Sequence, residues 1–426
     1  MPGQEAVTVR APVRPGQLSE LSRALEASEQ SGARPGSLPA RLPLGDFAEV
    51  HFARFFLLDA VTLHSGETVP ESLVYMADVD GSVERHLCAL VDRAPAGLDE
   101  LFGHCEGYPA GPDRDSRLDW LHEHTLAPAA YYVHTVGRTV GQVKDETRLF
   151  DALQTVLDSG EVVSGRADPV RLRSDLRAAV LRRSDFSWAT RLPAGPGAVR
   201  QVRDALHLYA TLVGLLLLGP FALLPGLVWL LLLRLHELRD TQESGVPDQR
   251  HVEEVRRYED YGAQNPFTAV GEVKPGVVRG FTMRVALAGL GLFCRHAAAR
   301  DNLAGVTSIH FARWVPIDDG RRLIFASSYD GSLESYMDDF ISRLSWGINL
   351  VFSNGAGFPR TRWLVLGGAR DEIRYKHYLR RHQVPTVVFY SAYPQSSAPN
   401  LDRFSSVRLG LRDRDPARAA SWLGQL

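Results

Sequence analysis

The sequence predicts an α+β protein that contains two tandem copies of one unit, with a hydrophobic helical segment inserted between them. Three observations lead to this prediction. The phrase His-Phe-Ala-Arg-aromatic occurs twice, at 51–55 and at 310–314. The segments that flank the two phrases match each other in kind and in order. Between the copies lies an apolar run, 208–233, without a charged side chain.

Each copy opens with a short apolar strand, a Pro-Gly turn and a helix, within 7–25 and 268–287. Proline presets φ and glycine supplies the tight bend, so both helices are expected to start alike. The repeated phrase follows in a second strand. The third strand of each copy ends in Asp-Gly-Ser, and we expect Asp80 and Asp330 with the following serines to cap the next helix.

Each copy then continues with a helix, an irregular segment and a final strand. This is the split βαβ order of a ferredoxin-like unit. Because a four-stranded sheet with helices on one face leaves its other face bare, two such units tend to press their sheets together. We therefore expect an intramolecular α+β barrel, with a first copy at 1–145, a helical linker at 146–262 and a second copy with a C-terminal tail at 263–426.

In this order of elements, residues 5–140 and 266–396 resemble the dimeric α+β barrel superfamily. That superfamily includes dye-decolourising peroxidases, chlorite dismutases and small monooxygenases. The resemblance implies redox chemistry, with haem as the expected cofactor.

The apolar run at 208–233 is long enough to cross the roughly 30 Å hydrocarbon core of a bilayer. A simple crossing would separate the two copies, and Gly-Pro at 219–220 with Pro-Gly at 225–226 should break a helix. We therefore predict a bent hairpin whose two arms, each about 16 Å long, dip into one leaflet. The arginine-rich stretch 166–203 suits anionic headgroups on a cytoplasmic face. A buried helix pair and a single crossing are the alternatives.

The overall composition narrows the class of protein. A formal net charge of −2 argues against a nucleic-acid-binding protein. The three cysteines lie far apart without a CxxC spacing, so neither a disulfide framework nor a structural zinc site is expected. The expected partners are membrane lipid and an apolar small molecule.

Residues shared by both copies include His51 with His310 and Arg54 with Arg313. Because side chains alternate along a strand, histidine and arginine should project to opposite faces, one toward the sheet–sheet interior and the other toward the helix layer or a rim. They form either a polar pair that anchors the strand or a set that lines the barrel and binds a cofactor or ligand.

The clearest difference between the copies is His104-Cys105-Glu106, which stands where the second copy has Asn-Gly-Ala. Imidazole, thiol and carboxylate can act as acid/base, nucleophile or metal ligand. An irregular polar turn is the structural alternative.

Dye-decolourising peroxidases carry a Gly-x-x-Asp-Gly motif whose aspartate is the distal acid/base. The segments that end in Asp80 and Asp330 resemble it without the leading glycine, which implies the same role for these carboxylates. A haem would also need an axial ligand, commonly histidine. His104 and His296 are the candidates because neither has a counterpart in the other copy.

The function predicted from these features is that of a membrane-associated redox enzyme, haem-dependent and peroxidase- or oxygenase-like, acting on an apolar or lipid substrate. The alternative is a non-catalytic lipid-binding or scaffold protein. No Gly-rich phosphate loop, Gly-x-Ser-x-Gly or His-Glu-x-x-His motif occurs.

Overall fold

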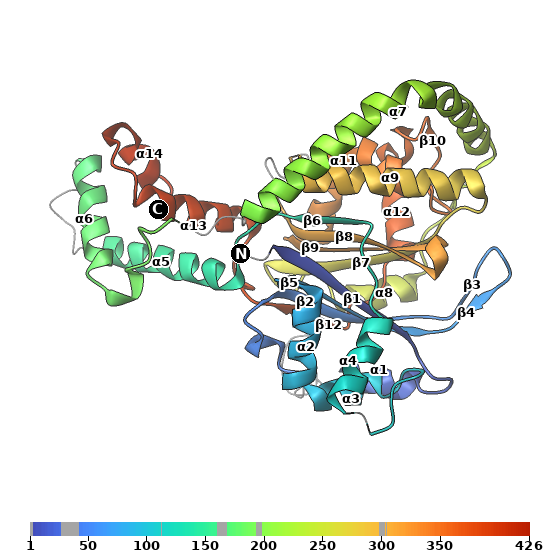
Figure 1. Ribbon diagram of the computed structural model, residues 1–426, viewed down its shortest axis with the longest axis horizontal. Coiled ribbons are helices and arrows are strands. Elements are labelled where there is room, and N and C mark those ends of the chain that lie inside the picture. Colours follow the sequence, from blue (N-terminus) through green and yellow to red (C-terminus); the bar gives the residue numbers. More distant parts are fainter. Residues whose placement is uncertain are drawn as a thin grey trace.

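The computed structural model describes residues 3–26, 42–111, 113–159, 168–192, 198–297, 303 and 305–426. These residues form an α+β protein with two four-stranded antiparallel sheets (Figure 1). The first sheet has the order β1 (Gln4–Pro12), β5 (Ser72–Asp80), β2 (Val50–Leu58), β12 (Val388–Ser391). The second has the order β6 (Ala130–Val133), β8 (Ile309–Ile317), β9 (Arg322–Asp330), β7 (Gln264–Glu272).

The two sheets repeat each other in register as well as in order. Gln4 pairs with Asp80 in the first sheet, and Gln264 pairs with Asp330 in the second. The strand that carries the repeated phrase shifts register at His51 in one copy and at His310 in the other. The tandem duplication expected from the sequence therefore includes the register shift, which occurs at the equivalent histidine of each copy.

The last strand of each copy belongs to the sheet of the other copy, which the sequence did not predict. β6 comes from the first copy and pairs with β8 of the second, whereas β12 comes from the second copy and pairs with β2 of the first. We expected each unit to hold its own four strands. The exchange instead makes each sheet depend on both copies.

The predicted closed barrel does not form in the described residues, whose main strands make two separate sheets. Before crossing over, each last segment touches the first strand of its own copy at a single bridge, Val9 with Thr125 and Ala269 with Gln383. Four residues separate each bridge from the strand in the other sheet, and each gap contains a proline that has no N–H to donate. Continuous pairing around the rim is interrupted there.

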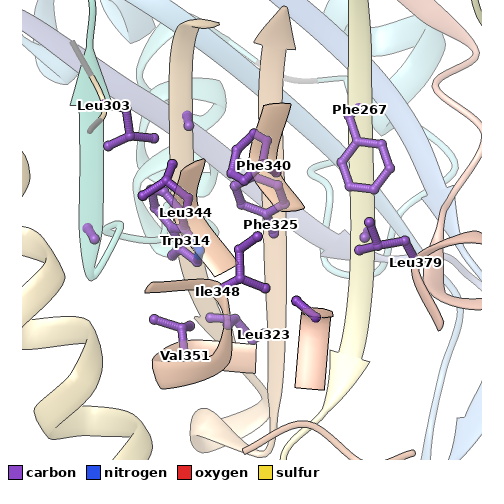
Figure 2. Packing of buried hydrophobic residues seen from close by; sticks show 14 of the residues in the cluster. Phe267, Leu303, Trp314, Leu323, Phe325, Phe340, Leu344, Ile348, Val351 and Leu379 are labelled. Atoms are coloured by element: carbon purple, nitrogen blue, oxygen red, sulfur yellow. The ribbon is translucent and has the colours of Figure 1, made fainter. Parts of the chain in front are cut away.

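Helices cover the outer face of each sheet, and the inner faces meet (Figure 1). The first sheet is covered by α1 (Leu18–Glu26), α2 (Val83–Arg93), α3 (Pro95–Phe102) and α4 (Arg114–Glu123). The second is covered by α9 (Val277–His296), α11 (Leu333–Phe352) and α12 (Glu372–His382). Figure 2 shows the second outer core, in which Trp314 and Phe325 of the sheet pack against Leu344 and Ile348 of α11.

Four further helices form a group beside the sheets, seen at the left of Figure 1. They are α5 (Val140–Asp158), α6 (Pro169–Leu181), α13 (Ala398–Gly410) and α14 (Ala419–Leu423). Their apolar faces share one core that includes Leu149, Leu176, Val407 and Trp422. Because α5 follows β6 and α13 follows β12, the duplication continues one helix beyond the last strands.

The remaining described helices and short strands connect these layers. They are α7 (Ala198–Arg239), α8 (Gln249–Arg256), and the two-residue strands β3 (Val61–Thr62), β4 (Thr68–Val69), β10 (Thr361–Arg362) and β11 (Leu366–Gly367). β3 pairs with β4, and β10 pairs with β11.

The expected capping by the Asp-Gly-Ser turns is correct only for the serines. Ser82 is the N-cap of α2, where its hydroxyl accepts from the Arg85 N–H at 3.2 Å, and Ser332 caps α11 in the same way. The carboxylates of Asp80 and Asp330 bind elsewhere, because the last residue of the strand points away from the helix that follows its turn.

The inner faces meet through aliphatic side chains, including Met76, Val315 and Ile324, and through two buried arginines. Arg54 of the first sheet donates to the carbonyls of Phe267 and Ser327 in the second sheet, both at 2.9 Å.

Arg313 of the second sheet makes the corresponding contacts with the first sheet. It donates to the Val7 carbonyl at 2.6 Å, to the Ala77 carbonyl at 2.9 Å and to the Asp78 carboxylate, all in the first sheet. In the second copy Ser328 stands where Asp78 stands in the first, and its hydroxyl accepts from Arg54 at 2.7 Å. The interface therefore holds two guanidinium groups and one carboxylate in contact with them.

Replacing Asp78 with Ala should destabilise the protein by about 3–5 kcal/mol, because a buried arginine then loses its only carboxylate partner. Ser328→Ala is the matched control and should cost about 1 kcal/mol, since it removes one hydrogen bond at the equivalent position. Denaturant unfolding of the detergent-solubilised chain measures both. Equal costs for the two variants would contradict the role assigned to the carboxylate.

Candidate functional site: an arched apolar helix over the second sheet

The apolar run lies within one helix, α7, of 42 residues. The prediction of a two-armed hairpin broken at the centre is therefore wrong. Pro220 and Pro225 lie inside the helix. Each proline removes one hydrogen bond and bends the helix, but the neighbouring N–H groups continue the ladder on both sides.

The N-terminal half of α7 is attached to the C-terminal end of α9. Arg295 donates to Asp204 at 2.9 Å, and His207 Nδ1 lies 3.2 Å from His296 Nε2. The His296 pKa is lowered by partial burial and by the neighbouring imidazole and Arg295, so its neutral form is favoured at this contact.

The C-terminal half of α7 is attached to the N-terminal end of the same helix. Trp229 donates from Nε1 to the Thr282 hydroxyl at 3.0 Å. Asp240, just after α7, accepts from Lys274 at 2.8 Å and from the buried Arg279. Both ends of α7 therefore rest on α9, with the two helices antiparallel.

These contacts require α7 to arch. Asp204 and Trp229 are about 25 positions apart, whereas their partners on α9, Arg295 and Thr282, are about 13 positions apart. At 1.5 Å per residue the two paths measure about 37 Å and about 20 Å. The extra length bows α7 outward between its attachments, as Figure 1 shows above α9.

The middle of α7 is apolar on all sides and exposed. Its most apolar 18-residue window has a mean hydropathy of 2.3, and none of that window is buried. Phe221, close to the two prolines, is 80% exposed. A soluble helix normally buries one face of such a segment. The exposed helix is consistent with membrane association, although composition alone is weak evidence for it.

Glu237 fixes the C-terminal end of α7. Its buried carboxylate accepts from the Thr361 hydroxyl at 3.0 Å and from the N–H groups of Trp363 and Leu364 at 2.9 and 2.8 Å. Both of the last two residues have positive φ, 57° and 61°. The carboxylate holds the tight turn between β10 and β11, so the arch ends on a rigid support.

The predicted cofactor-binding residues His51 and His310 lie at the rim, where the sheets meet the helix group. His51 Nε2 lies 3.0 Å from the Asp80 carboxylate, and Nδ1 lies 2.9 Å from the Tyr393 hydroxyl. The second carboxylate oxygen of Asp80 accepts the first N–H of α5, from Val140, at 2.8 Å.

The second copy repeats this network. His310 Nε2 lies 2.7 Å from Asp330, whose other oxygen accepts the first N–H of α13, from Ala398, at 2.7 Å. The structure thus brings each predicted histidine to its predicted aspartate. In both copies the pair joins the bulged strand to a helix N-terminus, where a carboxylate is stabilised by free N–H groups and the helix dipole.

Arg54 and Arg313 face the opposite sheet. The expected projection of histidine and arginine to opposite faces is not seen, because the strands shift register at His51 and His310 and the His51 ring lies 5.2 Å from Phe311 of the opposite sheet. Burial lowers the Arg54 pKa to about 10, while Asp78 opposes the shift. Their hydrogen bonds to carbonyls of the opposite sheet make the two guanidinium groups part of the sheet interface.

His104, Cys105 and Glu106 form a turn that ties α3 to the end of β1. His104 Nδ1 lies 2.8 Å from Gln17 Oε1, and the Glu106 N–H donates to the Pro12 carbonyl at 2.8 Å. Cys105 is fully buried, and burial raises its thiol pKa to about 12. The three side chains are not brought together in one pocket: the thiol points into the core and the Glu106 side chain is exposed.

The two predicted metal ligands also lie apart. His104 belongs to the helix layer of the first sheet, and His296 ends α9 over the second. Three cavities adjoin α9, and neither imidazole lines any of them. The described residues contain no group of three or more His, Cys, Asp or Glu side chains that could hold a metal ion. The two histidines therefore do not form a shared metal site.

Comparison with known proteins adds no relative: no family model, curated protein or solved structure matches the chain.

Asp78 and Trp314 are two residues that the sequence reasoning did not single out. A signal was present for both, since Ser328 and Phe55 replace them at the equivalent positions of the other copy.

The raised thiol pKa values predict a sharp order of cysteine modification. Cys105 and Cys294 are both buried with pKa values of about 12, so fewer than about one thiol in ten thousand is ionised at neutral pH. Maleimide labelling followed by mass spectrometry should modify the partly exposed Cys88 first and the other two only after denaturation. Rapid modification of Cys105 in the folded chain would restore its candidacy as a nucleophile.

Proposed function

We propose that this protein is a monotopic membrane protein that binds lipid or another apolar molecule, with the arch of α7 inserted into the cytoplasmic leaflet and both copies on the cytoplasmic side. The arch supplies the apolar surface, and the paired sheets form the soluble body. In this proposal α9 is the helix on which the arch rests and is not a second membrane span, because it also packs on the second sheet.

One observation carries the proposal. β6 precedes α7 in the chain and β8 follows it, yet the two are hydrogen-bonded neighbours in one sheet. A sheet cannot be divided by a bilayer, so the segments before and after α7 stay on one side. This favours insertion from one side over the single crossing.

The size of the arch agrees with insertion into one leaflet. A symmetrical bend of about 37 Å of helix over a base of about 20 Å rises about 16 Å above that base. Half of a hydrocarbon core of roughly 30 Å is about 15 Å. The midpoint of this symmetrical bend lies at 216–217, so the exposed segment from there to Phe221 would reach toward the middle of the bilayer.

The cytoplasmic orientation rests on the arginine-rich stretch 166–203, of which 166–167 and 193–197 lie outside the described residues. Part of this stretch serves packing, since Arg173 is buried and donates to the Asp415 carbonyl at 2.9 Å. Exposed neighbours such as Arg171 and Arg182–Arg183 leave cationic charge for headgroups.

The predicted redox activity has less support from the geometry than binding does. His51 uses both ring nitrogens in contacts with Tyr393 and Asp80, and Cys105 is buried as a neutral thiol. An absorption spectrum of the purified chain with added haemin tests this alternative directly. A Soret shift that is lost in His104→Ala or His296→Ala would favour the enzyme.

Placing charges at the centre of the arch should abolish membrane binding without unfolding the protein. Phe221→Glu with Leu224→Glu changes two side chains that are already exposed, at 80% and 72%. A charged residue near the bilayer centre costs about 2.5–3.5 kcal/mol on insertion scales, so partition into vesicles should fall at least a hundredfold. Flotation with phosphatidylcholine–phosphatidylserine vesicles measures the loss.

Ile373→Glu is the matched control, because Ile373 is 70% exposed on α12, away from the arch. This variant should float like the unmodified chain. Topology is tested in proteoliposomes by an impermeant maleimide against Cys88 in the first copy and an introduced Ser335→Cys in the second. Modification of the two sites from opposite faces of the bilayer would refute monotopic insertion.

A further inference from the structure

A cavity of about 140 Å³ lies between α9 and α11, over the outer face of the second sheet. Its walls are almost entirely hydrocarbon and aromatic. They include Gly289, Phe293, Trp314, Leu344, Trp346 and Ile348. Figure 2 shows Trp314, Leu344 and Ile348 together at the base of this region.

One wall residue carries an unused hydrogen-bond donor. The Trp314 indole is 4% exposed, and its buried Nε1–H has no hydrogen-bond partner among the residues that the structure describes. A buried tryptophan usually finds an acceptor for this group. A water molecule would need two or more polar partners, and an apolar cavity of this size stays dry. The missing acceptor therefore points to a ligand that brings its own oxygen.

The mouth of the cavity faces the arch. On the exposed side of α9, Gly289 lies one helical turn beyond Val285 and two turns beyond Phe281. The Phe281 ring packs against Trp229 of α7 at 4.6 Å between centroids. Trp346, on the opposite lip, is 49% exposed. A molecule in the membrane next to α7 would thus meet the opening directly.

The first copy has no equivalent of this donor. Phe55 takes the place of Trp314, and its ring has no hydrogen-bond donor. The donor is therefore an addition to the copy that carries the arch, not a requirement of the shared fold.

We propose that this cavity binds the ring of a membrane-dissolved quinone, inserted carbonyl first. The carbonyl oxygen accepts from Trp314 Nε1, and the alkyl or isoprenoid tail leaves past Gly289 into the lipid beneath α7. The size agrees with one six-membered ring, because an apolar cavity of about 150 Å³ accommodates benzene. The inference rests on the proposed membrane attachment, which gives such a molecule access.

The test compares two probes with the same tail, 2-decyl-1,4-benzoquinone and decylbenzene, on the full chain in detergent micelles. The chain carries Cys88→Ser, because an unsubstituted quinone ring adds to accessible thiols and the other two cysteines are buried. Only the quinone offers an acceptor, and we expect it to bind more tightly by isothermal titration. Trp314→Phe, which introduces the side chain of the first copy, should weaken quinone binding about three- to tenfold and leave decylbenzene binding unchanged.

Gly289→Leu should block the mouth and abolish binding of both probes, whereas Ala288→Leu, the adjacent exposed position, should not. Equal affinity of the two probes, or an unchanged quinone affinity in Trp314→Phe, would overturn recognition of the carbonyl. Undiminished binding by Gly289→Leu would overturn the location. Because micelles replace the bilayer, the Phe221→Glu/Leu224→Glu variant should still bind the quinone, so this test fails independently of membrane insertion.

Discussion

The architecture depends on the reciprocal contact in which each copy of the repeated phrase sends its arginine across to the sheet of the other. Arg54 and Arg313 each bind two backbone carbonyls of the opposing sheet. A carbonyl oxygen within a sheet accepts a strand-to-strand hydrogen bond with one lone pair. The guanidinium groups donate to the second lone pair. This fixes the register of one sheet on the other more strictly than aliphatic packing does, because a shift of one residue would leave buried charges without acceptors.

The exchanged strands turn this contact into one indivisible body. β6 and β12 each leave the copy that encodes them, and the helices that follow, α5 and α13, pack together at the rim. There the His51–Asp80 and His310–Asp330 pairs hold the two helix N-termini. Neither copy has a complete sheet without the other. A segment inserted between them must therefore return to the side from which it left, and this constraint shapes α7 as an arch.

Much of the fold could be predicted from the sequence because the duplication supplies an internal comparison. The order of elements follows from the repeated phrase and the segments that flank it, whereas strand alternation alone did not decide whether histidine or arginine faces the interior. The strand exchange could not be predicted, since Tyr131 and Phe389 would suit the edge of either sheet. The prediction that Pro220 and Pro225 break the helix was also wrong. They bend one long helix whose ends are fixed by contacts of Asp204 and Glu237, and these contacts could not be inferred from the sequence. The candidate catalytic set was the least predictable, because burial of Cys105 depends on the packing of α3.

The departures from symmetry indicate where the function lies. Shared residues such as the two arginines maintain the interface. The second copy departs in a connected set: a long apolar α9, the indole of Trp314 beneath it, and α7 attached across it by Arg295 and Arg279. The first copy has a phenylalanine at the position of Trp314. An exposed apolar arch and a buried unpaired donor both destabilise a purely soluble protein. Because both adjoin α9, they favour a single use, in which the membrane covers the arch and a ligand drawn from the membrane accepts from the indole.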